Sequence, residues 1–171
     1  MSFNQTKFKN LVHYICHKAD REKLGAVKLN KILWFSDVQA YVIWGHSITG
    51  ESYVKQERGP TPRHIIDTLS QLVNENKLLQ RDIDHIGYKK REYITLEHPD
   101  ISSFNAEEIS IVHDVIKEII DNHTAQSISD ATHTKIWELA NWMEEIPYNT
   151  IFAVEFAEIK ENDIYWAKSC I

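Results

Sequence analysis

Histidine has the widest chemical range of the residue types in this sequence, because near neutral pH it acts as an acid, a base or a metal ligand. Of the nine histidines, only His13 and His17 have the i, i+4 spacing that places two imidazoles on one helical face. Two ligands on an exposed stripe make a weak site, since zinc sites use three or four side chains. Cys16 and Cys170 form no CxxC pair, so we expect no metal centre, no disulfide framework and no cofactor.

Asp37 is more informative, because it interrupts a long apolar helical stretch. A buried carboxylate must be paired or hydrogen-bonded, or else protonated. One interpretation is a structural partner such as Arg58, Arg63 or His133. The alternative is a polar floor to a pocket beside this helix, which in an uncharacterised enzyme would be lined by Asp37, Arg58 and His133.

Asp130 and His133 could be taken for an acid-base pair, but no Ser or Cys lies in a Gly-x-Ser-x-Gly context. We interpret Asp130 as a helix cap and His133 as the donor of a structural hydrogen bond. The sequence therefore predicts no catalytic residues and a protein that is not an enzyme.

Residues 77–91, which predict a hairpin, contain five basic side chains: Lys77, Arg81, Lys89, Lys90 and Arg91. A helix followed by a basic hairpin resembles a winged helix, whose wing can contact phosphates. The preceding helix carries only Arg63, His64 and Asp67 near its start, which is a poor set for reading bases. Nucleic-acid binding is therefore the alternative prediction.

Charge is distributed unevenly along the chain, whose formal net charge is -6. Residues 1–100 contain 15 Lys and Arg against 12 Asp and Glu, a net charge of +3, whereas residues 101–171 contain 4 against 13, a net charge of -9. The acidic second half is either a solvated face or a docking surface for a basic partner. With no signal peptide and no apolar run near ~18 residues, we expect a soluble, cytoplasmic protein without membrane contact.

The element that positions Asp37 is a helix over residues 28–45, apolar over most of its circumference and therefore buried. Gly45 is suited to its left-handed C-cap. A first amphipathic helix covers Phe8 to Cys16, and Tyr53 and Val54 begin a short strand that runs to Gly59. Thr61 and Pro62 have the types of an N-cap and first turn, and predict the start of a third helix.

The second half of the chain predicts two antiparallel strands, over residues 78–83 and 91–96, followed by helices. Asn105 and Glu108 have capping-box spacing. Ser127 or Ser129 would cap a later helix that continues to Met143. Residues 150–156 could be strand or helix, and residues 164–169 predict a short terminal helix. At 171 residues the chain fits one α+β domain over 1–171, mainly helical around a central buried helix, with a small antiparallel sheet or winged-helix-like hairpin.

Two blocks of sequence, KLNKILWFSDVQAYVIWGHSITGESYVKQERGPTPRHI and SDATHTKIWELANW, resemble the Panacea-domain family, also described as SocA-like antitoxins. The resemblance covers about Phe8 to Trp142. Trp34 stands where the family more often has Tyr. The residues that carry the resemblance are Lys28, Leu29, Lys31, Leu33, Trp34, Phe35, Asp37, Gly45, Ile48, Thr49, Gly50, Tyr53, Gly59, Pro60, Ser129, Thr132, His133 and Trp137.

The resemblance implies a prokaryotic or phage-associated cytoplasmic protein that binds a partner rather than catalysing a reaction. Its members are taken to be antitoxins that neutralise a toxin by direct binding, or adaptors that present it to a protease. The expected partner is therefore a protein toxin or a protease. The residues we expect to serve binding are Trp34, Asp37, Tyr41, Thr49, Tyr53, Arg58, Pro60, His133 and Trp137.

Overall fold

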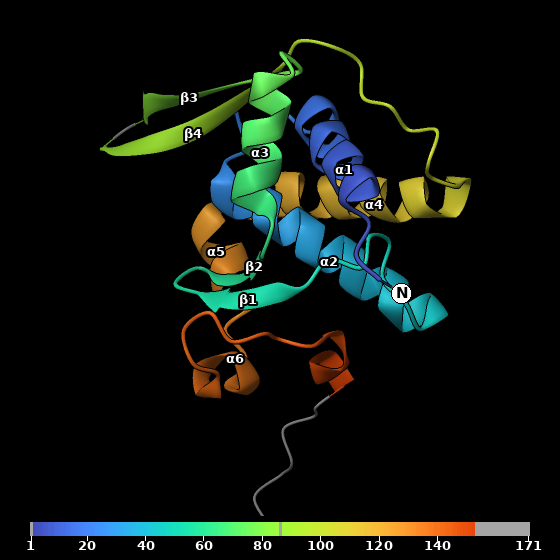
Figure 1. Ribbon diagram of the computed structural model, residues 1–171. Coiled ribbons are helices and arrows are strands. Elements are labelled where there is room, and N and C mark those ends of the chain that lie inside the picture. The colour runs from blue at the N-terminus through green and yellow to red at the C-terminus, as the bar shows by residue number, and fades with distance from the viewer. Residues whose placement is uncertain (1, 86, 153–171) are drawn as a thin grey trace, which may run out of the picture.

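The computed structural model describes residues 2–85 and 87–152 and has an α+β fold (Figure 1). The chain order is α1 (Gln5–Lys18), α2 (Ala26–Trp44), β1 (Tyr53–Gln56), β2 (Gly59–Pro62), α3 (Ile65–Asn74), β3 (Leu78–His85), β4 (Tyr88–Thr95), α4 (Ala106–Asn122), α5 (Ala125–Asp130), α6 (Lys135–Leu139) and the 3-10 helix η1 (Tyr148–Phe152). Within the described residues, every helix is too short or too polar to span a lipid bilayer.

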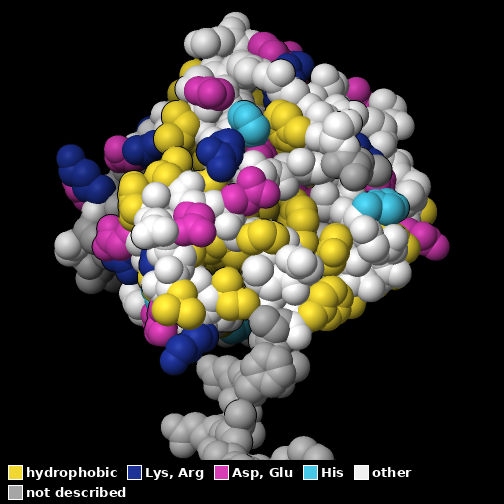
Figure 2. All heavy atoms as spheres, turned by 60° about the horizontal axis from the view of Figure 1, so that its bottom comes forward, with side chains coloured by type: hydrophobic (Ala, Val, Ile, Leu, Met, Phe, Trp, Pro, Cys, Tyr) yellow, Lys and Arg dark blue, Asp and Glu magenta, His cyan; other side chains and the backbone are white. Residues whose placement is uncertain are grey.

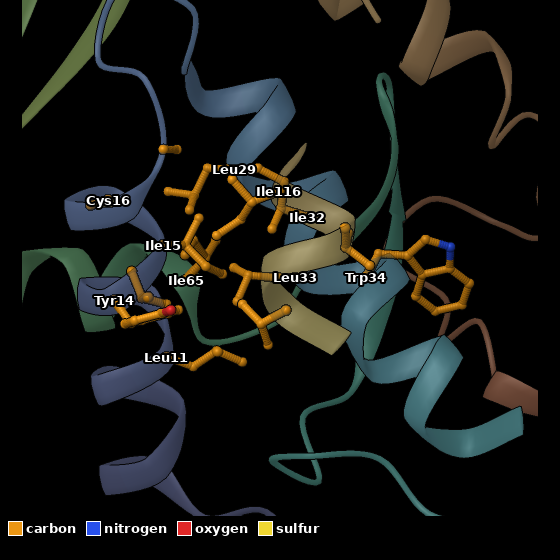
Figure 3. Close-up of a cluster of buried hydrophobic side chains, with 14 of the residues drawn as sticks. Leu11, Tyr14, Ile15, Cys16, Leu29, Ile32, Leu33, Trp34, Ile65 and Ile116 are labelled. Carbon is orange, nitrogen blue, oxygen red and sulfur yellow. The ribbon is translucent and has the colours of Figure 1, made fainter. Parts of the chain in front are cut away.

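Helix α2 is the centre of the core, as its apolar pattern predicts. Leu29, Ile32 and Leu33 are fully buried and face α1 and α4, whereas Trp34 points to the other side of the helix (Figure 3). Gly45 ends the helix with φ 74°, the left-handed conformation that glycine adopts without a steric penalty. The last turn differs from the prediction, because Ile43 is 56% exposed.

Helices α1 and α4 pack on α2 through amphipathic faces, and local caps set where they begin. The Asn4 side chain accepts from the Lys7 amide at the start of α1. Asn105 and Glu108 form the predicted capping box at the start of α4. The buried apolar side chains of these three helices, including Cys16, belong to one cluster.

The strands form two separate two-stranded antiparallel sheets, β1-β2 and β3-β4. The predicted hairpin of residues 78–96 is confirmed. The prediction that Thr61 and Pro62 begin a helix is wrong, because both residues lie in β2, which pairs with β1 in the register Val54 to Thr61. Turn residues and cap residues share side-chain types, so composition alone did not distinguish the two structures.

The helix predicted from Ser127 or Ser129 to Met143 is also wrong, since the chain forms two short helices there. Thr124 caps α5 and Thr134 caps α6. Asp130 is the last residue of α5 and not a cap. Of the undecided region 150–156, residues up to 152 belong to η1; the remainder, and the helix predicted over 164–169, lie outside the described residues, as does Cys170.

Candidate functional site

Asp37 holds the loop that follows α2. One carboxylate oxygen accepts from the backbone amides of Ile48, at 2.8 Å, and Thr49, at 3.2 Å. The other accepts from the Thr49 hydroxyl at 3.1 Å and from the Tyr53 hydroxyl at 2.8 Å. Asp37 therefore joins α2 to β1, and the predicted partners Arg58, Arg63 and His133 are not its partners.

The ionisation of Asp37 links this loop to pH. Complete burial raises the pKa of Asp37 from 3.8 to about 6, although the four hydrogen bonds act in the opposite direction. Below pH ~3 the carboxyl is protonated in both folded and unfolded chains. Between pH 4 and pH 6 the unfolded chain ionises while the folded chain stays protonated, so the folded state loses stability, by roughly 3 kcal/mol once the pH has passed the folded pKa.

We therefore expect the stability difference between the wild type and Asp37→Asn to depend on pH. The wild type should lose about 3 kcal/mol relative to the variant between pH 3 and pH 7, because asparagine does not ionise. Urea unfolding at both pH values measures this difference. A difference that stays constant across this range would show that burial does not control the ionisation of Asp37.

An aromatic cluster lies beside the Asp37 network. Trp34 packs edge-on against Tyr53, with ring centroids 5.0 Å apart, and stacks on Tyr148 at 5.9 Å. Tyr41 also stacks on Tyr148, with ring centroids 5.6 Å apart. The Tyr148 hydroxyl donates to the backbone carbonyl of Glu51. These contacts attach η1, at the end of the described chain, to α2 and to the start of β1.

The β1-β2 turn is held from both sides by residues of the two sequence blocks. From α2, the Lys31 ammonium donates to the Pro60 carbonyl at 2.9 Å. From α5, the Ser129 hydroxyl donates to the Arg58 carbonyl at 3.0 Å. Gly59 lies between them with φ 97°, and a Cβ atom at this position would be 2.2 Å from the Thr132 hydroxyl. The tertiary structure therefore brings the two blocks together around one turn.

His133 and Trp137 form the next contact along the chain. Their rings stack with centroids 3.8 Å apart, and the Lys55 ammonium lies 4.7 Å from the Trp137 ring. The same ammonium donates to the carbonyls of Glu138 and Ala140, each at 2.8 Å, near the C-terminus of α6. Burial lowers the pKa of His133, and the positive charge of Lys31 lowers it further.

The residues predicted to serve binding divide into two groups. Trp34, Asp37, Thr49, Tyr53 and Pro60 are buried, so they hold the loop and the turn in place. Those with some exposure are Tyr41, Arg58, His133 and Trp137.

The enzyme alternative would require Asp37, Arg58 and His133 to converge, but their hydrogen bonds go elsewhere. Asp37 binds the loop that follows α2, Arg58 donates to Gln126, and His133 lies next to Ser129. Nothing in these contacts joins the three side chains in one site.

The described part of the chain contains no group of three His, Cys, Asp or Glu side chains able to hold a metal ion. His13 is 3% exposed, so the exposed stripe expected to carry His13 and His17 does not exist. Only His17 of the two reaches the surface.

The basic hairpin is largely neutralised by its own neighbours. Arg81 pairs with Glu92 at 2.6 Å and Arg91 with Asp82 at 2.5 Å. Helix α3, which would read bases in a winged helix, contains Asp67 and no Lys or Arg. Lys77 pairs with Glu75, Lys90 donates to backbone carbonyls of the turn after α1, and Lys89 is opposite Asp84 across the hairpin. Paired charges release fewer counterions on binding DNA, so this arrangement is a weak phosphate surface.

The sequence prediction missed an exposed apolar surface at the other end of the molecule, on α6, η1 and the segment between them. We name it the α6–η1 surface. Its apolar members are Leu139 (75% exposed), Trp142 (65%), Met143 (42%), Ile151 (37%) and Phe152 (58%), and Glu138, Glu144 and Glu145 are exposed among them. Figure 2, in which this end of the molecule faces the viewer, shows apolar side chains interspersed with acidic ones. The signal available in the sequence was the density of large apolar residues over residues 136–152. The structure shows that the helices there, α6 and η1, have only five residues each.

Comparison with known proteins places this geometry in a family. A family model described as antitoxin SocA-like, Panacea domain, matches residues 29–138, which is more than half of the chain and runs from α2 into α6. It includes the Asp37 network, the β1-β2 turn and the α5 residues that hold it. No match was found among curated proteins or among solved structures. The chain belongs to the SocA-like antitoxin family that carries the Panacea domain.

Proposed function

We propose that this protein is an antitoxin-like binding module that neutralises a protein toxin by direct contact or presents it to a protease. The observation that supports this proposal most directly is the α6–η1 surface. Five large apolar side chains are exposed within residues 139–152, and monomeric proteins rarely expose large apolar patches that have no binding role.

The charge around these side chains favours a basic partner. Glu138, Glu144 and Glu145 are exposed beside the apolar residues. Lys135 is the basic residue of the same segment, and the Arg63 guanidinium lies 4.0 Å from Glu145. Hydrogen bonds from Asn141 lower the pKa of Glu144, so this carboxylate stays ionised at neutral pH. Acidic groups around an apolar centre steer a basic partner to the surface and help to specify it.

The rest of the site acts as the scaffold for this surface. Tyr148 joins η1 to Trp34 and Tyr41, and Lys55 holds the C-terminus of α6. The family residues of α2 and β1 therefore fix where the α6–η1 surface lies without touching a partner themselves.

Substitution of Leu139 and Phe152 by serine tests the proposal. The protein would be co-expressed with the product of the neighbouring gene, purified through a tag, and examined for a stoichiometric complex. We expect the double variant to weaken binding at least 30-fold, since each anchor at the centre of an interface contributes about 2 kcal/mol. Rescue of cells from toxicity should fall in parallel.

Ile66→Ser is the matched control, because Ile66 is 71% exposed but lies in α3, away from the α6–η1 surface. Its affinity should remain within about twofold of wild type. Equal losses in the double variant and in the control, or no complex with any neighbouring gene product, would contradict the proposal. Copurification of nucleic acid in place of protein would support the winged-helix alternative instead.

A further inference from the structure

A cleft of about 270 Å³ opens at the N-terminal end of α2. Val27, Asn30 and Lys31 of α2 form one wall, Glu57 and Arg58 of the β1-β2 turn form another, and Trp142 lies at its edge. Pockets for drug-sized ligands measure roughly 300–1,000 Å³, so this cleft suits a smaller molecule.

Lys31 is the unusual member of this cleft. Its side chain is 1% exposed, and among the described residues no carboxylate oxygen lies within 4.0 Å of its ammonium. The ammonium has three N–H donors, of which one binds the Pro60 carbonyl at 2.9 Å. A buried cation without a counter-ion is costly, and an anion in the cleft would remove much of that cost.

Two further features of the cleft favour a negative ligand. Arg58 is exposed at the wall, where one guanidinium nitrogen donates to Gln126 and the other donors are available to a ligand. Helix α2 begins at the cleft without a capping side chain on Gly25 and without an acidic residue in its first turn, so its partial positive charge is not offset locally. Trp142 and Val27 add apolar surface.

We propose that this cleft binds a small organic carboxylate, whose oxygens pair with the exposed Arg58 guanidinium in the positive field of the buried Lys31 ammonium and whose apolar body packs against Trp142. The cleft shares Trp142 with the α6–η1 surface but does not include Leu139 or Phe152, so the double variant of those two residues tests partner binding without changing a residue of the cleft. Failure of one proposal therefore leaves the other standing.

Binding should depend on pH through Lys31. Burial lowers the pKa of Lys31 to about 7, so the protonated fraction falls about tenfold between pH 6 and pH 8, and carboxylate affinity should fall with it. The other charged or titratable groups around the amine are Glu57, Arg58 and His133. The pKa of His133 is lowered by burial and by Lys31, so this imidazole carries less positive charge over the range than a solvent-exposed histidine.

Calorimetric titration with benzoate tests the proposal, with neutral benzamide as the matched probe. We expect saturable binding of one benzoate at concentrations up to about 10 mM, with affinity about tenfold weaker at pH 8 than at pH 6. Benzamide should bind at least tenfold more weakly than benzoate at pH 6. Glu57→Gln should tighten benzoate binding severalfold, because it removes a like charge from the wall.

Lys31→Met should weaken benzoate binding at least tenfold and remove its pH dependence. Lys28→Met is the control, because Lys28 is also buried on α2, at 7% exposure, but does not line the cleft; its affinity should match wild type. If Lys31→Met does not fold, Arg58→Gln tests the proposal in its place, since this exposed residue can be changed without loss of core packing. Arg58→Gln should also weaken benzoate binding. The absence of saturable benzoate binding, equal binding of benzamide, or wild-type affinity in the Lys31 or Arg58 variant would overturn the proposal.

Discussion

Replacing Asp37 with alanine is expected to lower the free energy of unfolding by about 4 kcal/mol. The carboxylate is fully buried and accepts four hydrogen bonds from the loop after α2 and from Tyr53. Alanine would leave the amides of Ile48 and Thr49 without an acceptor, and each buried unsatisfied donor costs about 1–3 kcal/mol. Urea denaturation followed by circular dichroism measures the change.

Two variants calibrate this expectation. Tyr53→Phe removes one of the four donors and should cost about 1 kcal/mol. Asp114→Ala removes an exposed carboxylate from α4 and should stay within about 0.5 kcal/mol of wild type. If Asp37→Ala proved no more destabilising than Asp114→Ala, the role of Asp37 in holding the loop would have to be abandoned.

Gly59→Ala should be about as damaging, with an expected loss of about 3–5 kcal/mol. The φ angle of 97° is one that alanine rarely adopts, and the added Cβ would lie 2.2 Å from the Thr132 hydroxyl and 2.5 Å from the Lys31 ammonium. The turn must then move away from α2 or α5, with loss of the hydrogen bonds from Lys31 and Ser129. Thermal and urea unfolding report this loss.

Gly45→Ala separates the two causes, because Gly45 also has positive φ, 74°, but nothing lies within 4 Å of its added Cβ. This control should cost about 1 kcal/mol from backbone strain alone. Thr132→Ala in the Gly59→Ala background should recover part of the difference, since it removes the closest contact. A Gly59→Ala loss equal to that of Gly45→Ala would mean that close packing at the turn contributes nothing.

Asp37 and Gly59 show why most of the residues that carry the family resemblance are buried. One fixes the loop between α2 and β1, and the other allows the β1-β2 turn to approach Lys31 and Thr132 closely. Both residues are buried. Under the proposed function, their substitution is therefore expected to affect partner binding only indirectly, through the position of the α6–η1 surface.

Features whose signals lie within a few residues could be predicted from the amino-acid sequence. The buried character of α2 and its Gly45 cap follow from apolar periodicity and glycine conformation. The capping box of α4 needs only Asn105 and Glu108, and the β3-β4 hairpin follows from β-forming residues on either side of Gly87. The α+β class and the resemblance to the SocA-like antitoxin family also follow from the sequence.

Which side chains meet across the fold could not be predicted from local sequence signals. The partners of Asp37 include backbone amides of Ile48 and Thr49, and every residue except proline carries such a donor. Side-chain types therefore pointed to Arg58 or His133 instead. Whether Leu139 and Phe152 are buried or exposed depends on which elements pack over α6 and η1, and that depends on the whole fold. The cleft at Lys31 likewise exists only because the β1-β2 turn folds back on α2, so its walls come from three separate stretches of the chain.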